Sequence, residues 1–115
     1  MKTIQGESFE VRLDEDSSTI FFKGALRLSG TDEYLSILNL LKGTLANPQP
    51  MILLDVTELD FLNSSGITMF SRFVIEVRDR SQINLQFRAS EKIPWHARSL
   101  KNLQKLMPAL HITMS

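Results

Sequence analysis

Residues 51–66 read MILLDVTELDFLNSSG, and this stretch decides how the chain folds. Its first five residues, Met51–Asp55, form a short apolar run that is typical of a strand buried on both faces in a parallel sheet. Residues 57–63 predict a loop. Asn63 and the two serines after it are favoured at helix N-termini, so we expect a helix to begin near Ser64. A buried strand, a loop and a capped helix in this order predict one unit of an α/β sheet.

The segment on the N-terminal side predicts an antiparallel hairpin. Apolar side chains alternate with polar ones over residues 7–14 and again over residues 19–28, which is the period of a half-buried strand. The polar run 14–18 between them predicts the turn. Gly24 interrupts the apolar face of the second strand and indicates a bulge or a close approach of two backbones.

Three stretches have the apolar spacing of helices. The first follows cap residues at 29–32 and ends at residues 47–50, which include two prolines. The second begins near Ser64. The third begins at Pro94 and ends at Pro108, because proline cannot continue a helix.

Two further alternating runs complete the expected sheet. Residues 83–87 and 110–114 predict strands after the second and third helices. The element order is therefore ββαβαβαβ. This alternation indicates a mixed, mostly parallel sheet, to which the N-terminal hairpin adds antiparallel pairing. We expect a single α/β domain over residues 1–115.

The composition restricts the classes of function. The chain has 115 residues, a formal net charge of zero, no cysteine and two histidines. These features argue against nucleic-acid binding, disulfides and thiolate zinc sites, and we expect no metal, no cofactor and no catalytic residue. No apolar run approaches the roughly 20 residues of a membrane-spanning helix. The first residues lack the apolar segment of a signal peptide, so we expect a cytoplasmic protein without direct membrane insertion.

Charge is distributed unevenly along the chain. Residues 1–60 contain 5 basic and 10 acidic side chains, whereas residues 61–115 contain 8 basic and 3 acidic ones. Either the two halves attract one another within the fold, or the charges are solvated, or they orient a charged partner. Arg98, Lys101 and Lys105 share one face of the third expected helix, where they are either solvated or bind a partner.

Residues that can carry chemistry gather after the central strand. Ligands of open α/β sheets bind beside the carboxyl ends of strands, and the expected loop carries Glu58 and Asp60 there. The hydroxyl groups of Ser64 and Ser65 either cap the helix or are exposed for modification. A serine hydrolase would need a base and an oxyanion hole, and no local motif places either histidine as that base.

The same stretch resembles the signature of the STAS domains, the family named after sulfate transporters and anti-sigma factor antagonists. In that family Asp-x-Ser/Thr is followed, after a spacer, by Asp-Ser-Ser/Thr-Gly at the start of the second helix. The matching residues here are Asp55 and Thr57, then Asn63, Ser64, Ser65 and Gly66. The expected element order matches the family along nearly the whole chain, so the resemblance implies a STAS-like fold.

The resemblance implies partner switching of the kind performed by bacterial anti-sigma factor antagonists. In the family the first serine of the motif, here Ser64, is phosphorylated by a serine kinase that is also the anti-sigma factor. Phosphorylation ends the binding between antagonist and kinase, and a serine phosphatase reverses it. Ser65 is the second choice for the modified residue. The implied switch loop consists of Asp55, Thr57, Glu58, Asp60, Asn63 and Gly66.

A second interpretation is a constitutive scaffold subunit without phosphoregulation, like STAS modules that assemble onto transport ATPases or signalling complexes. The family commonly has Asp before the modified serine, whereas this chain has Asn63, which caps a helix equally well but holds no charge. This departure favours the scaffold, whereas the intact Ser-Ser-Gly favours the switch. In both cases we expect a binding module rather than an enzyme, and a monomer or weak dimer.

Two leucines lie beside the apolar stripe of the first expected helix. Leu35 and Leu40 either widen its buried face or form an apolar rim for a partner. A rim is reasonable because exposed apolar patches mark interfaces.

Overall fold

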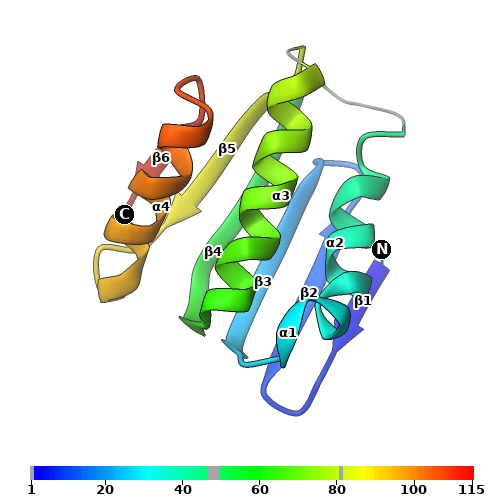
Figure 1. Cartoon of the computed structure of the whole chain (residues 1–115), viewed down its shortest axis with the longest axis vertical. Coiled ribbons are helices and arrows are strands. Elements are labelled where there is room, and N and C mark those ends of the chain that lie inside the picture. Colours follow the sequence, from blue (N-terminus) through cyan, green and yellow to red (C-terminus); the bar gives the residue numbers. More distant parts are fainter. Residues whose placement is uncertain (1, 47–49, 81) are drawn as a thin grey trace.

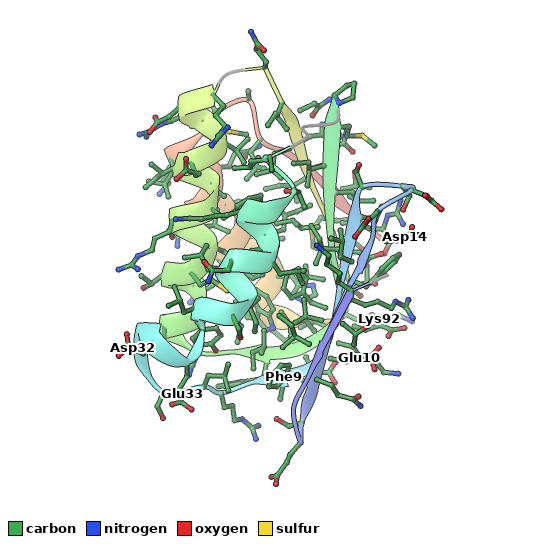
Figure 2. All side chains as sticks on the ribbon, turned by 90° about the vertical axis from the view of Figure 1, so that its right-hand side faces the viewer. Phe9, Glu10, Asp14, Asp32, Glu33 and Lys92 are labelled. Atoms are coloured by element: carbon green, nitrogen blue, oxygen red, sulfur yellow. The ribbon has the colours of Figure 1, made fainter. Side chains whose placement is uncertain are left out.

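All helices that the structure describes lie on one face of a six-stranded sheet (Figures 1 and 2). The computed structural model describes residues 2–46, 50–80 and 82–115. Its elements in chain order are β1 (Lys2–Gln5), β2 (Phe9–Asp14), β3 (Thr19–Leu26), α1 (Gly30–Glu33), α2 (Leu35–Gly43), β4 (Met51–Leu62), α3 (Ser64–Arg80), β5 (Asn84–Ala89), α4 (Pro94–Leu106) and β6 (His111–Met114). Figure 2 shows the helices to the left of the sheet, and none of the described helices covers its other face.

The strands follow one another across the sheet in the order β1-β2-β3-β4-β5-β6. β1, β2 and β3 form an antiparallel meander, and the β3–β4, β4–β5 and β5–β6 pairs are parallel. The predicted α/β class, the mixed sheet and the N-terminal hairpin are confirmed. The predicted order ββαβαβαβ lacks the edge strand β1. It also lacks the division of the first helix into α1 and α2, which meet at Tyr34.

The central strand β4 is longer than expected, because residues 57–62, predicted as a loop, continue the strand to Leu62. Leu59 and Leu62 are buried, so their backbone groups need partners inside the protein. β3 supplies these partners, with Gly24 opposite Leu59 and Leu26 opposite Leu62. Two register shifts interrupt this pairing, and they break the alternation that would have indicated a strand.

Three buried phenylalanines connect the sheet to the central helix. They are Phe22 of β3, Phe70 of α3 and Phe87 of β5. The centroid of the Phe70 ring lies 5.1 Å from that of Phe22 and 5.6 Å from that of Phe87, both in edge-to-face geometry. Such pairs add about 0.5–1.5 kcal/mol each to the burial of apolar area. They fix α3 across the middle of the sheet, with Ser64 beside the end of β4.

The helix α2 ends at Gly43, earlier than expected. The Thr44 hydroxyl donates a 2.6 Å hydrogen bond to the carbonyl oxygen of Leu41 and so satisfies one of the last carbonyl groups of the helix. The prediction that residues 47–50 end this helix concerns a stretch of which residues 47–49 lie outside the described residues.

Gly24 lies where β3 approaches the connection between β1 and β2. Its φ angle is +92°, in the region that favours glycine. Beside it, the N–H of Ala25 donates to the carbonyl oxygen of Ser8 at 2.8 Å, and the Ser8 hydroxyl donates to the carbonyl oxygen of Ala25 at 2.9 Å. A Cβ atom on Gly24 would overlap the Ser8 carbonyl oxygen. The register shift and close backbone approach predicted at this glycine are confirmed.

Gly24→Ala should lower the free energy of unfolding by more than about 2 kcal/mol, because it combines a left-handed backbone with an overlap against a carbonyl oxygen. Gly43→Ala is the matched control, since a Cβ atom there meets nothing within 4 Å. Urea denaturation of both variants beside the wild type checks the prediction. Equal stabilities of the two variants would contradict it.

Candidate functional site

The side chain of Asn63 holds the beginning of α3. Its Oδ1 accepts a hydrogen bond from the backbone N–H of Gly66 at 3.0 Å, an N-cap interaction. The same oxygen accepts a 2.6 Å bond from the hydroxyl of Tyr34, and Nδ2 donates to the carbonyl oxygen of Leu28 at 2.8 Å. One side chain therefore connects the segment after β3, the junction of α1 with α2, and the start of α3.

Tyr34 and Gly66 both donate hydrogen bonds to the side-chain oxygen of Asn63. Tyr34 is buried, and burial raises the pKa of its hydroxyl because the phenolate would lose its hydration. The hydroxyl therefore stays protonated and donates to Asn63 at neutral pH. A Cβ atom on Gly66 would overlap the side chain of Leu62 and come within 3.0 Å of the Tyr34 hydroxyl oxygen, so glycine is needed for this close packing.

The two serines of the motif have different surroundings. Ser64 is the first residue of α3 and is exposed. Ser65 is half-buried in a small crevice that also contains Tyr34 and Leu38. Among the described residues, no acceptor binds the backbone N–H of either serine, whereas that of Gly66 is bound. The Ser64 hydroxyl is thus the more accessible of the two, and it stands beside free N–H groups of a helix start.

Asp55 and Thr57 lie within β4, far from Ser64. Asp55 Oδ1 accepts bonds from the Thr57 N–H at 3.0 Å and the Thr57 hydroxyl at 2.7 Å, next to the first register shift against β3. Asp55 Oδ2 lies 3.5 Å from Nη1 of Arg88. The Asp-x-Thr part of the motif therefore stabilises a bulge. At about 3.3 Å per residue, Asp55 is on the order of 30 Å along the chain from Ser64.

The residues predicted as one switch loop are therefore divided between two places. Glu58 and Asp60 are exposed positions of the strand β4 and not of a loop. Of the predicted carboxylates, Asp60 is nearest in sequence to Ser64, and its carbonyl oxygen accepts a 3.1 Å bond from Nε1 of Trp95. The structure brings Asn63, Ser64, Ser65 and Gly66 together at the helix start, while Asp55, Thr57 and Glu58 lie along the uncovered face of the sheet.

A polar hollow of about 280 Å³ lies on this uncovered face. Charged residues line it: Glu10, Arg12, Lys23, Asp55 and Glu58. The guanidinium carbon of Arg12 lies 4.9 Å from the ring centroid of Phe21, and its buried Nε has no hydrogen-bond partner among the described residues. Charges of both signs mix here, so the hollow is not selective for an ion of one sign.

Two features that would indicate other functions are missing from residues 2–46, 50–80 and 82–115. No three His, Cys, Asp or Glu side chains gather there as ligands for a metal ion. None of the helices is both long enough and apolar enough to cross a membrane.

His96 is fully buried between the end of β4 and the start of α4. Its Nδ1 accepts a hydrogen bond from the Ser90 N–H at 3.0 Å, so Nε2 carries the proton and donates to the Leu59 carbonyl oxygen at 3.0 Å. Burial lowers the pKa of His96, since the charged ring would lose its hydration. Both ring nitrogens are thus used in the neutral form, and His96 acts as a fixed link rather than a free base.

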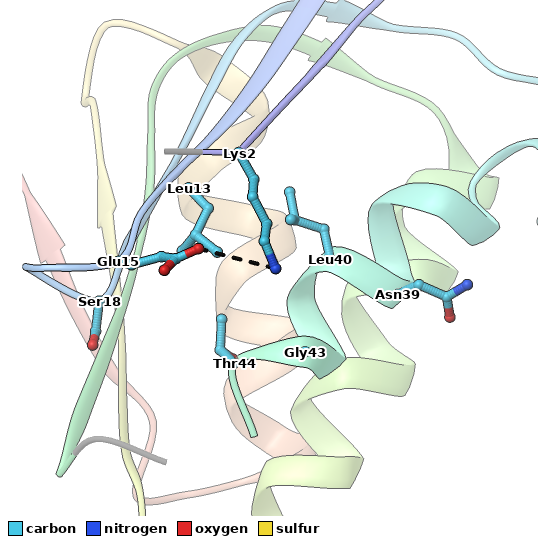
Figure 3. Close-up of a pocket in the computed structure, with 8 residues that line it drawn as sticks. All are labelled: Lys2, Leu13, Glu15, Ser18, Asn39, Leu40, Gly43 and Thr44. Carbon is cyan, nitrogen blue, oxygen red and sulfur yellow. Dashed lines mark ion pairs between the residues drawn. The ribbon is translucent and has the colours of Figure 1, made fainter. Parts of the chain in front are cut away.

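Leu35 and Leu40 face different surfaces and do not form one continuous rim. Leu35, the first residue of α2, is 49% exposed. Leu40 lies about 140° further around the helix, as five residues imply. It lines a hollow of about 350 Å³ together with Leu13 (Figure 3). At this hollow Lys2 Nζ lies 4.0 Å from Glu15 Oε1.

Phe61 is a candidate contact residue that the sequence analysis does not single out. It is 41% exposed, and the guanidinium carbon of Arg27 lies 4.8 Å from its ring centroid. Trp95, which donates to the neighbouring Asp60, places a second aromatic side chain at the same end of β4. Because residues 57–63 were predicted as a loop, Phe61 was assigned to neither face of the sheet. A tryptophan at the start of the third expected helix is typical of a packing anchor, but the contact of Trp95 with Asp60 was not predicted. The hydrogen bond between Trp95 and Asp60 spans 35 residues of sequence, so no local pattern indicates it.

Solved structures of low sequence identity share this fold over the whole chain. A chain in the crystal structure of the diguanylate cyclase SiaD in complex with its activator SiaC from Pseudomonas aeruginosa matches with a TM-score of 0.77 and 14% identity, covering 100% of both chains. SiaC of Pseudomonas aeruginosa matches with a TM-score of 0.72 and 14% identity, covering 100% of this chain and 97% of that chain. Apo-SiaC from the same organism gives a TM-score of 0.74 at 13% identity, covering 100% of this chain and 99% of that chain. At these identities the likeness concerns the fold alone. No family model and no curated protein matches the chain.

Asn63→Asp should lower the free energy of unfolding by about 1–2 kcal/mol at neutral pH. Aspartate keeps the acceptor for Gly66 and Tyr34, but it places a second carboxylate oxygen against the Leu28 carbonyl oxygen, to which the amide now donates. Thermal denaturation beside the wild type measures the change. A variant as stable as the wild type would show that the bond to Leu28 contributes nothing to the fold.

The stability of the protein should decrease as the pH falls below about 6.5, the ordinary pKa of histidine. The unfolded chain then takes up a proton at His96, whereas the lowered pKa keeps the native ring neutral. The loss should continue until the native ring is also protonated. Urea titrations between about pH 7.5 and pH 5 measure the slope.

His96→Asn should flatten this slope, whatever its effect on absolute stability. His111→Asn is the control, because His111 is exposed on the edge strand β6, and it should keep the slope of the wild type. A slope that survives in His96→Asn would assign the pH dependence to other groups.

Proposed function

We propose that this chain is a regulatory protein-binding module whose partner binding is controlled by phosphorylation of Ser64. The observation that carries the proposal is the position of this serine. Its side chain is exposed at the first residue of a 17-residue helix whose start is held by Asn63. A kinase can reach such a hydroxyl, and a negative charge suits a helix N-terminus, so modification leaves the fold in place.

The surface around Ser64 has the composition of a protein-binding site. The starts of α2, α3 and α4 and the end of β4 lie at the same end of the molecule (Figure 1). Leu35 and Phe61 are exposed there, Arg27 lies over the Phe61 ring, and Trp95 is half-buried. Aromatic side chains and arginine are enriched among the residues that contribute most to protein–protein affinity. These side chains support Ser64 as part of a contact surface.

A phosphate on Ser64 would alter this surface strongly. It adds about −1.5 to −2 charges at pH 7. Asp32 and Glu33 on α1 and Asp60 on β4 are already exposed and acidic, so the new charge adds to theirs. A partner whose surface fits the neutral serine loses affinity through desolvation of the phosphate and through its bulk and charge. The predicted direction of the switch is therefore release on phosphorylation.

The solved structures of similar fold support a role exerted through a partner. SiaC is described as the activator of a diguanylate cyclase and is found in complex with it. In our proposal this chain likewise acts by binding and not as an enzyme, in the cytoplasm. As the STAS resemblance implies, its partners are a serine kinase that also serves as an anti-sigma factor, and a serine phosphatase.

The amide of Asn63 favours a second candidate function, a constitutive scaffold subunit of a transport ATPase or signalling complex. The family commonly has a carboxylate at this position, whereas here an amide donates to Leu28. Whatever the carboxylate does in kinase recognition or phosphoryl transfer is absent. The two functions differ in the effect that a negative charge at position 64 has on partner binding.

Ser64→Glu should fold and bind the partner at least about tenfold more weakly than the wild type, because of the charge placed in the contact surface. Ser64→Ala should keep partner binding, never become phosphorylated, and lose at most about 1 kcal/mol of stability. Titration calorimetry with the partner captured from the source cell measures binding. Mass spectrometry of the wild type locates the phosphate on Ser64 or Ser65.

Ser17→Glu is the charge-matched control, because Ser17 is exposed in the turn between β2 and β3, away from the start of α3. It should bind like the wild type. If Ser64→Glu binds as tightly as this control, the phosphoswitch is wrong and the constitutive scaffold takes its place.

A further inference from the structure

The outer face of α4 carries a row of positive charges. Arg98, Lys101 and Lys105 are exposed, and their spacing places them on one side of the helix over about 10 Å. α4, with the sequence PWHARSLKNLQKL, contains no acidic residue. Figure 1 shows α4 in front of the edge of the sheet opposite the N-terminal hairpin. These three side chains are called the basic stripe below.

Acidic side chains of the described residues do not neutralise the basic stripe, none of whose members is in an ion pair. The helix packed against α4 is α3, and its last turns carry Glu76 and Asp79. Glu76 carboxylate oxygens lie 3.9 Å from Lys42 Nζ and 3.7 Å from Arg80 Nε. Asp79 Oδ1 lies 3.3 Å from Arg78 Nε. The acidic groups of α3 are therefore directed to other cations.

The stability of the fold does not explain the stripe. Side chains three and four residues apart on a helix are neighbours, so Arg98 repels Lys101 and Lys101 repels Lys105. A cation near the last carbonyl groups of a helix is favourable, which accounts for Lys105. Arg78 adds a second cation there, since its Nη1 donates to the carbonyl oxygen of Leu106 at 3.3 Å. Arg98 and Lys101 thus add repulsion without a compensating contact in the described part of the protein.

We propose that the basic stripe is a docking surface for an acidic segment of a protein partner. Charge complementarity carries the inference, because a row of carboxylates on the partner would relieve the repulsion along α4. The formal net charge of zero argues against nucleic acid, because non-specific nucleic-acid binding usually accompanies a basic excess over the domain. Three charges also fall short of the clusters of about 4–8 that bind anionic membranes. The docking surface is independent of the phosphorylation of Ser64.

The test uses the full chain and short poly-L-glutamate as the anionic probe. Trp95 is the single tryptophan of the chain and lies one turn before Arg98, so its fluorescence reports binding along the stripe. The stripe variant combines Arg98→Gln, Lys101→Gln and Lys105→Gln. The matched variant combines Lys2→Gln, Lys23→Gln and Arg72→Gln, which removes the same charge from exposed positions on β1, β3 and α3.

At low salt the stripe variant should bind poly-L-glutamate about tenfold more weakly than the wild type. The affinity of the matched variant for the same probe should decrease by less than about twofold. The double variant Arg98→Gln, Lys101→Gln keeps the favourable cation at Lys105, and it should melt at the same temperature as the wild type or higher, because repulsion along α4 is removed. Added salt should weaken binding of the wild type, since the contacts are exposed to solvent.

Equal losses in the two variants would mean that only net charge matters, and would overturn the docking surface. So would tighter binding of duplex DNA, or of phosphatidylglycerol vesicles, than of poly-L-glutamate. A lower melting temperature of the double variant Arg98→Gln, Lys101→Gln would assign these two charges to the stability of α4 and would equally overturn the proposal.

Discussion

The amide of Asn63 is the interaction on which the arrangement of the site depends. Its oxygen accepts from Tyr34 and Gly66, and its nitrogen donates to Leu28, so one group joins partners 29 and 35 residues away in sequence to the start of α3. α1 has four residues and cannot be stable alone, so the bond from the adjacent Tyr34 helps to place it. An amide supplies the acceptor and the donor at once, which a carboxylate cannot do. The exposed Ser64 is therefore the first residue of a helix whose start is held by three hydrogen bonds of the neighbouring Asn63 side chain.

The uncovered face of the sheet explains which parts of the fold were predictable. The apolar faces of β2, β3, β5 and α3 produce clear periods, because each buries one side against the other layer. The end of β4 instead carries Glu58 and Asp60 toward solvent and contains two register shifts, so its pattern is that of a loop. The strand β1 is short and mostly exposed, and its sequence KTIQ contains too little alternation to mark a strand.

The candidate site was predictable where it depends on local chemistry and not where it depends on distant contacts. The cap residue Asn63 and the helix start at Ser64 follow from residue types that are neighbours in sequence. Asp55 and Ser64 are far apart because the strand β4 extends between them. The length of β4 depends on its pairing with β3, which is a contact between segments distant in sequence. The STAS-like motif therefore has two structural parts. Asp55 and Thr57 hold a bulge within β4, and Asn63 caps the start of α3 just beyond the end of that strand.

The strand order β1-β2-β3-β4-β5-β6 is also the order of synthesis. Each strand joins an edge that already exists, and no strand has to be inserted between two neighbours. Ribosomes add roughly 5–20 residues per second, which is slow compared with the microseconds in which a hairpin forms. The β1-β2-β3 meander can therefore pair while β4 is still being made, and it then offers β4 an open edge as a template. Growth of the sheet and elongation of the nascent chain proceed in the same direction.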